Sequence, residues 1–298
     1  MVRFTNIIKY YFRKLRRKIT YYNIHIYPNI FRPTSKPFIS GDTFRDYSNH
    51  IHDETQGFDL KKVKKNDIIF LKSELIDTFF NYFHPKIKEP YILITHNSDF
   101  IIEEKHLSYK DDLIIHWFAQ NLNFPNNDGV SVLPIGLENK RYLNNGVLRD
   151  FKNYQNQKKN SHILCSFNEN THPERGEVLS VIENNIYVDI ANFKSHKEYI
   201  KNMSQYKFNL CPRGNGHDTH RFWESLMVGT FPIVERNSFT TNMENMGIPA
   251  IYLDSWNQLN SYDINNLNDI FIKLTKKDKD KYLSFEFWKE NINSKVLS

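Results

Sequence analysis

The stretch KFNLCPRGNGHDTHRFWESLMVGTFPIVE, residues 207–235, decides the fold of the second half of the chain. It begins with a short apolar run, 208–211, and ends with another, 231–234. Between them, a loop with two glycines leads into an amphipathic segment, 218–228, which Gly229 ends. This order of strand, loop, helix and strand predicts one βαβ unit of a parallel sheet.

The loop and the first turns of the predicted helix carry groups suited to a phosphate ligand. Gly214 and Gly216 would let the backbone approach a ligand closely, and unpaired N–H groups at a helix start favour an anion. Arg213 and Arg221 offer forked donors to phosphate oxygens, and Glu224 can accept hydrogen bonds from ribose hydroxyls. The sequence therefore predicts a nucleoside diphosphate site beyond the carboxyl ends of the strands.

A purely structural interpretation of the same residues stays open. Asp218 can cap the helix, Arg221 and Glu224 can form a surface ion pair, and the glycines can simply make a turn. The glycine spacing matches neither the phosphate-binding loop of P-loop proteins nor the dinucleotide fingerprint.

The stretch resembles the C-terminal signature of exostosin-like (GT47-type) glycosyltransferases, of the type that makes bacterial or viral surface polysaccharides. In that signature a strand ends in Pro-Arg-Gly, a helix carries Asp-x-x-Arg-x-x-Glu, and Gly-x-x-Pro-Ile-Val follows. The matching residues are Pro212, Arg213, Gly214, Asp218, Arg221, Glu224, Gly229, Pro232, Ile233 and Val234. Residues 38–45, 95–99 and 134–139 also look like parts of bacterial proteins found with surface-polysaccharide genes.

The resemblance implies an α/β protein of the GT-B class, with two Rossmann-like lobes and a nucleotide-sugar site in the C-terminal lobe. Glu224 would bind the ribose, Arg213 and Arg221 would neutralise the departing diphosphate, and transfer to the glycan acceptor would invert the sugar. Arg175, in the polar stretch after the apolar run 162–167, is a further candidate for a phosphate ligand, although an arginine in a loop can equally be solvated. The predicted donor site comprises Arg175, Arg213, Gly214, Asn215, Gly216, Asp218, Thr219, Arg221 and Glu224.

We expect no cofactor and no required metal. A departing phosphate can be stabilised by cationic side chains alone. The one Asp-x-Asp sequence, Asp278-Lys279-Asp280, lies in a lysine run typical of a solvated helix start, and no Cys/His cluster has zinc spacing.

The rest of the chain divides into lobes with alternating strands and helices. We predict an acceptor lobe over 38–150 and a nucleotide-sugar lobe over 160–298, joined by the polar stretch 144–161. The predicted strands of the first lobe are 67–71, 91–95, 113–117 and 130–135, with a helix at 73–83. Those of the second are 162–167, 187–190, 208–211, 231–234 and 250–252, in a doubly wound sheet, followed by a helical tail over 267–292.

Transfer with inversion requires a base that takes the proton of the acceptor hydroxyl. The candidates in the first lobe are Asp42, His96, Asp99 and Glu138, each of which can equally be a cap or a turn residue. Asp99 and Glu138 are the favoured pair, because each follows a predicted strand, and together with His96 they should line the space between the lobes.

Residues 1–26 are predicted to form a basic amphipathic helix. Basic residues alternate with apolar ones at helical spacing over 1–19, as in helices that lie on an anionic membrane surface. Packing against the protein itself or against a partner stays open. The start lacks a signal-peptide core and no apolar run reaches about 18 residues, so we expect a cytoplasmic protein attached peripherally to the membrane face.

The distribution of charge argues against a nucleic-acid-binding protein. The net charge of +6 is concentrated in the first residues rather than along a groove, and no nucleic-acid-binding motif occurs, so nucleic acid is not an expected partner. The predicted function is transfer of a sugar from a nucleotide-sugar to a glycan or lipid-linked glycan acceptor, in cell-surface polysaccharide or lipopolysaccharide assembly. The alternative is a non-catalytic protein that binds sugar nucleotides or assists assembly.

Overall fold

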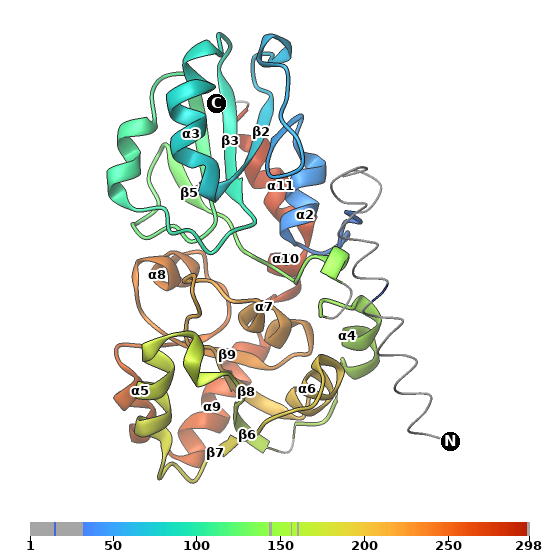
Figure 1. Cartoon of the computed structure of the whole chain (residues 1–298). Coiled ribbons are helices and arrows are strands. Elements are labelled where there is room, and N and C mark those ends of the chain that lie inside the picture. Colours follow the sequence, from blue (N-terminus) through green and yellow to red (C-terminus); the bar gives the residue numbers. More distant parts are fainter. Residues whose placement is uncertain (1–14, 16–31, 143–144, 156, 160, 297–298) are drawn as a thin grey trace.

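The computed structural model describes residues 15, 32–142, 145–155, 157–159 and 161–296 (Figure 1). The predicted basic helix over 1–26, and with it the proposed membrane surface over 1–19, lies outside the described residues apart from Leu15. No helix in the described part of the chain is long and apolar enough to cross a membrane.

The first lobe is built on a five-stranded parallel sheet. Its strands are β1 (His50–His52), β2 (Ile68–Lys72), β3 (Tyr91–His96), β4 (Ile114–Ala119) and β5 (Val130–Val132), in the order of the sequence. The four strands predicted for this lobe are confirmed, and β1 is an additional one. Their continuous apolar runs reflect a sheet that is covered on both faces.

Helices from distant parts of the chain cover the two faces of this sheet. On one face, Phe80 of α3 (Ile76–Tyr82) packs against Trp117, with ring centroids 6.1 Å apart. On the other, Phe44 of α2 (Gly41–Tyr47) packs against Phe285 of α11 (Phe285–Ser294), at 5.7 Å. The last helix of the chain therefore lies beside the first lobe (Figure 1).

The second lobe also contains a five-stranded parallel sheet, but its strand order reverses. From one edge to the other, the strands are β7 (Val188–Ile190), β6 (Ser161–Cys165), β8 (Tyr206–Leu210), β9 (Phe231–Glu235) and β10 (Ile251–Leu253). The reversal lies between β6 and β8, and it confirms the predicted doubly wound sheet. In such sheets ligands bind beyond the carboxyl ends of the strands at the reversal.

The helices of the second lobe position the loops above this reversal. They are α5 (Pro173–Ile182), α6 (His196–Met203), α7 (His220–Met227), α8 (Ser238–Asn245) and α9 (Ile264–Thr275). The predicted helix at 218–228 corresponds to α7, which begins two residues later. Gly229 has φ +69°, a conformation that glycine adopts readily, and it ends α7 as predicted.

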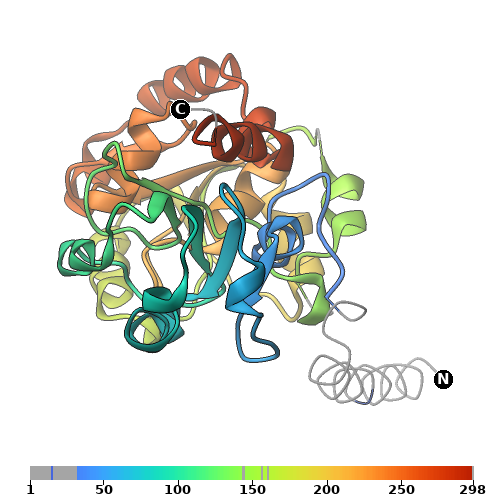
Figure 2. The ribbon, with the colours of Figure 1, turned by 90° about the horizontal axis from the view of Figure 1, so that it is seen from above.

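The structure corrects two expectations about the connections. The stretch 144–161 is not wholly a polar linker, because it contains α4 (Leu148–Tyr154), whose Phe151 is fully buried. The tail over 267–292 is broken at α10 (Asp280–Leu283), after which α11 crosses back: Phe285 N donates to Pro37 O at 2.8 Å. Figure 2 views the molecule from above, with the first lobe over the second. Two Rossmann-like lobes stacked in this way form the predicted GT-B arrangement.

Candidate functional site

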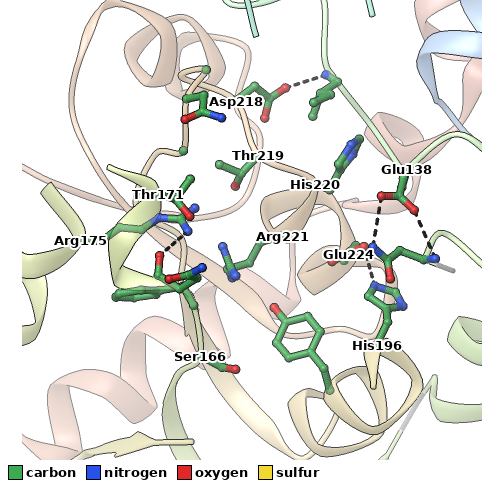
Figure 3. A pocket seen from close by; sticks show the side chains of 18 of the residues that line it. Glu138, Ser166, Thr171, Arg175, His196, Asp218, Thr219, His220, Arg221 and Glu224 are labelled. Atoms are coloured by element: carbon green, nitrogen blue, oxygen red, sulfur yellow. Dashed lines mark hydrogen bonds and ion pairs between the residues drawn. The ribbon is translucent and has the colours of Figure 1, made fainter. Parts of the chain in front are cut away.

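A cavity of about 550 Å³ lies beyond the carboxyl ends of β6 and β8. The loop after β6 contributes 166–168 and Thr171, the loop after β8 contributes Gly214 and Gly216, and the first lobe contributes Asp99 and Glu138. This cavity therefore occupies the strand-order reversal where a ligand is expected (Figure 3).

Two arginines point into this cavity from different elements. The guanidinium carbons of Arg175 on α5 and Arg221 on α7 lie 5.6 Å and 5.9 Å from the ring centroid of Phe167 (Figure 3). Arg175 is only 6% exposed; its Nε and one terminal nitrogen donate to the carbonyl oxygens of Arg213 and Asn168, both at 2.9 Å. The Nε of Arg221 is buried without a partner among the described residues.

Neither guanidinium has a carboxylate within ion-pair distance in the part of the chain that the structure describes. Burial, together with the charge of Arg221, lowers the pKa of Arg175 to about 10. An arginine at such a pKa stays protonated at neutral pH, so two positive charges share the cavity. Glu224 attracts Arg221, but it is already paired with His196, so the cavity keeps an excess of positive charge. Such an arrangement favours a ligand with at least two negative charges, which a diphosphate carries.

Glu224 also lines the cavity, but it is bound to a histidine that the sequence analysis did not single out. His196 Nε2 lies 2.7 Å from Glu224 Oε1, in an ion pair that is mostly shielded from solvent. Burial disfavours both charges, but their mutual attraction outweighs it, so the pKa of Glu224 is lowered and that of His196 raised. Glu224 is therefore ionised and not the surface residue that the structural alternative assumed.

Asp218 lines the cavity and also binds the first lobe. Its carboxylate accepts a hydrogen bond from Ile135 N at 2.6 Å (Figure 3). A second hydrogen bond comes from Trp223 Nε1 at 2.9 Å. Asn121 holds the Asp218 backbone N–H from the same lobe, at 2.9 Å. Both carboxylate oxygens already accept hydrogen bonds from the protein, so Asp218 joins the two lobes at the cavity wall. Its contact with the nucleotide-sugar stays a prediction. Asp218 does not cap α7, whose N-cap residue is Thr219.

The buried position of Asp218 gives a testable dependence of stability on pH. Burial raises the pKa of Asp218 from 3.8 to about 7, so the folded state favours the protonated carboxyl. The free energy of unfolding should therefore fall as the pH rises from about 4 to about 7, with a contribution from this group on the order of 4 kcal/mol. Urea unfolding at pH 5 and pH 8 measures it, and Asp218→Asn should show a smaller difference between the two pH values. An identical difference in both proteins would contradict this assignment.

Both glycines of the loop line the cavity, and one of them also permits the contact between the lobes. A Cβ atom on Gly216 would lie 2.6 Å from the side-chain nitrogen of Asn121, so only glycine permits this approach of the two lobes. A Cβ atom on Gly214 would come no closer than 3.4 Å to Arg175. The close approach predicted for Gly216 is therefore real, but the neighbour is the first lobe.

Arg213 does not reach the cavity. Its guanidinium turns back on its own loop and donates to Asn215 O at 3.0 Å, and it is absent from the cavity wall. The expectation that Arg213 meets the diphosphate is thus not supported, whereas Arg175 takes that position. Asn215 and Thr219 do line the cavity, and Asn215 also donates to Asp99 at 3.2 Å.

Of the four candidate bases in the first lobe, two line the cavity and two are buried away from it. Asp99 is exposed and lines the cavity; Glu138 lines it as well, and its two oxygens accept hydrogen bonds from Asn145 at 3.1 Å and 3.2 Å. Asp42 is 1% exposed, among the guanidinium groups of Arg32 and Arg141, and stabilises the lobe.

His96 is fully buried and does not line the cavity, contrary to prediction. Its Nε2 bonds to Pro134 O at 2.9 Å and its Nδ1 accepts from Asn97 N at 2.7 Å, so both nitrogens are engaged. Burial lowers the pKa of His96 to about 4, which keeps the ring neutral. His96 and Asp42 are therefore structural residues.

The Asp-x-Asp sequence lies away from the cavity, and three residues of the cavity wall were not predicted. Asp278 and Asp280 lie at the start of α10, outside the cavity wall. No group of three or more His, Cys, Asp or Glu side chains suited to a metal occurs among the described residues. His196, Tyr199 and His220 line the cavity but were not predicted; His220 lies inside the quoted stretch, four residues before Glu224, and helical spacing could have revealed it.

Comparison with known proteins finds one protein family. The family model described as RXYLT1 C-terminal domain, of a xylosyltransferase family, matches residues 149–296, just under half of the chain. This range holds the whole second sheet and most residues of the cavity wall. The second lobe is therefore similar to a glycosyltransferase domain. No curated protein sequence matches the chain.

Several solved structures are similar to this chain at low sequence identity. A structure described as trehalose-6-phosphate from E. coli bound with UDP-2-fluoro glucose has 8% identity and a TM-score of 0.46, over 78% of this chain and 74% of that one. The alpha,alpha-trehalose 6-phosphate synthase of Burkholderia multivorans has 8% identity and a TM-score of 0.44, over 80% of this chain and 71% of that one. The pneumococcal O-GlcNAc transferase GtfA in complex with UDP and GlcNAc has 11% identity and a TM-score of 0.39, over 80% of this chain and 59% of that one. At these values the likeness bears on neither activity nor substrate.

Proposed function

We propose that the chain is a glycosyltransferase that uses a sugar linked to a nucleoside diphosphate. The observation that carries this proposal is the pair Arg175 and Arg221, two buried cations without carboxylate partners among the described residues, in a cavity at the strand-order reversal. Because Glu224 is already paired with His196, the two arginines leave an excess of positive charge in the cavity. A bound diphosphate neutralises it.

The same residues account for the chemistry of transfer. As the bond between the sugar and the diphosphate breaks, negative charge develops on the departing phosphate oxygen, and the two guanidinium groups are placed to stabilise it. The start of α7, at Thr219, adds backbone N–H groups. Glu224 is ionised and lines the cavity, which suits hydrogen bonds from ribose hydroxyls. We propose that this charge stabilisation proceeds without a metal and that transfer inverts the sugar.

The match of the second lobe to a domain of a xylosyltransferase family supports a donor such as a nucleotide-linked pentose, with hexoses as the alternative. The exostosin-like resemblance of 207–235 supports a role in surface polysaccharide or lipopolysaccharide assembly, on a glycan or lipid-linked glycan. Residues 1–19 support attachment to the cytoplasmic face of a membrane. These finer assignments are proposals that rest on sequence.

Donor turnover tests the proposed function. The purified chain is incubated with UDP-, GDP- and dTDP-linked sugars, UDP-xylose among them, and with a CMP-linked sugar as control, and release of the nucleotide is measured. We expect release from a diphosphate donor and none from the CMP donor, whose single phosphate does not engage both arginines. Binding of a diphosphate donor without any release, with or without added glycosides, would instead identify a non-catalytic sugar-nucleotide-binding protein.

A further inference from the structure

A second cavity, of about 310 Å³, adjoins the first and lies mainly in the first lobe. Asp99, Ile135 and His220 belong to the walls of both cavities. We propose that His220 is the general base of the transfer, taking the proton of an acceptor hydroxyl that is held in the second cavity. This inference rests on the proposed function, and it places the base on the donor lobe instead of the acceptor lobe.

The hydrogen bond of His220 fixes which nitrogen can act as a base. Its Nδ1 lies 2.7 Å from the carbonyl oxygen of Gly136 (Figure 3 shows the ring). A carbonyl oxygen only accepts, so Nδ1 carries the hydrogen of the neutral ring and Nε2 keeps its lone pair. The carbonyl is itself held in place: Gly136 has φ +67°, and a Cβ atom there would lie 2.5 Å from Ile39 O.

The second cavity suits a ligand rich in hydroxyl groups. Gln120 in its wall is 1% exposed, and neither its side-chain oxygen nor its nitrogen has a partner among the described residues. Buried amides are normally satisfied, and a sugar hydroxyl can both donate to and accept from them. Asn97 and Asn139 add further amide groups to the same wall. The ligand class is therefore a carbohydrate, presented to His220 across the shared wall.

The two carboxylates near His220 are less suited to the role of base. Glu138 does not line the second cavity, and Asn145 donates to both of its oxygens. Asp99 lines both cavities but is exposed and already accepts from Asn215. A neutral imidazole titrates nearer to neutral pH than a carboxylate, which favours proton transfer under physiological conditions.

The transfer step balances with these groups. The acceptor oxygen attacks the anomeric carbon and forms the new glycosidic bond, while its proton passes to His220 Nε2. The bond from the anomeric carbon to the diphosphate oxygen breaks, and its electron pair leaves with the diphosphate beside Arg175 and Arg221. Glu224, one turn further along α7, carries a negative charge that interacts with His220.

The variant that tests the role of His220 as a base most directly is His220→Asn. The asparagine side-chain NH2 can replace Nδ1–H in the bond to Gly136 O, but nothing replaces Nε2. We expect kcat to fall by about 10²- to 10⁴-fold, as for other lost general bases, with donor affinity unchanged. The readout is release of nucleoside diphosphate from the donor found in the turnover screen, with water or methyl glycosides as acceptor, and calorimetry gives donor affinity. In His220→Ala, added imidazole should restore part of the rate, which a structural role would not produce.

The outcomes separate this inference from the proposed function. If His220→Asn turns over at the rate of the wild type, or if Asp99→Asn loses the rate while His220→Asn keeps it, His220 is not the base although the transferase assignment stands. If the wild type binds no diphosphate donor, or binds one and never releases the nucleotide, the proposed function fails and the role of His220 fails with it.

Discussion

Replacement of Arg221 by methionine is expected to weaken the binding of a nucleoside diphosphate and to destabilise the protein only moderately. In the unliganded protein, Arg221 is a buried cation that shares the cavity with Arg175 and has no carboxylate in ion-pair contact among the described residues. Its hydrogen bond with Tyr199 and its attraction to Glu224 outweigh burial and raise its pKa. Removing it should therefore lower the free energy of unfolding, by about 1–3 kcal/mol.

The affinity for the nucleoside diphosphate should fall as well. Hydrogen bonds to charged groups contribute about 1.5–3 kcal/mol, so the dissociation constant should rise by roughly 10- to 150-fold. Urea unfolding and calorimetric titration measure the two effects on the same samples. Arg213→Met is the matched control: this arginine lies in the neighbouring loop and bonds only to its own loop, so both quantities should stay near those of the wild type. An affinity of Arg221→Met equal to that of the wild type would show that Arg221 supports the fold and does not bind the nucleotide.

Replacement of Glu224 by alanine is expected to destabilise the protein by about 3–5 kcal/mol, because it leaves the His196 imidazolium buried without its partner. Nucleotide affinity should fall as well, since the ribose loses its acceptor. The measurement is urea unfolding of Glu224→Ala, His196→Ala and the double variant. The double variant should lose much less than the sum of the two single variants, which measures the coupling of the pair.

The coupling should depend on pH in a definite sense. The raised pKa of His196 makes its contribution complete below pH 6.5, and the contribution is lost as the pH rises through the folded-state pKa. The lowered pKa of Glu224 makes its contribution complete above pH 4.5, with loss at lower pH. The coupling is therefore largest between pH 4.5 and pH 6.5. For comparison, Asp254→Ala breaks an exposed ion pair with Arg236 and should cost less than about 1 kcal/mol. A similar loss in Glu224→Ala would contradict the account of the buried pair.

Much of the fold could be predicted because buried parallel strands need continuous apolar runs. The runs at 208–211 and 231–234 correspond to β8 and β9, and glycine at 229 marks the end of α7. The short strand β1 carries two histidines among its three residues and gave no such signal. Likewise, α4 lies in a run of Asn, Lys and Gln, and only its packing through Phe151 shows that it is a helix.

The candidate site could be placed from the sequence, but not the role of each residue in it. Which arginine reaches the cavity depends on where α5 begins, and no local pattern distinguishes Arg175 from Arg213. The pairing of Glu224 with His196 joins residues 28 positions apart, through the packing of α6 beside α7. Asp218 has the spacing of a ligand-binding residue, yet the first lobe supplies its hydrogen-bond donor, and such contacts between lobes leave no trace in local sequence.

The central claim is that the cavity between the lobes binds a diphosphate through Arg175 and Arg221. Calorimetric titration of UDP, GDP and dTDP into the wild type and into the Arg175→Met/Arg221→Met variant tests it most directly. We predict that at least one of these nucleotides binds the wild type and that the folded variant binds none. Equal binding to both proteins, or no binding to a folded wild type, would contradict the account.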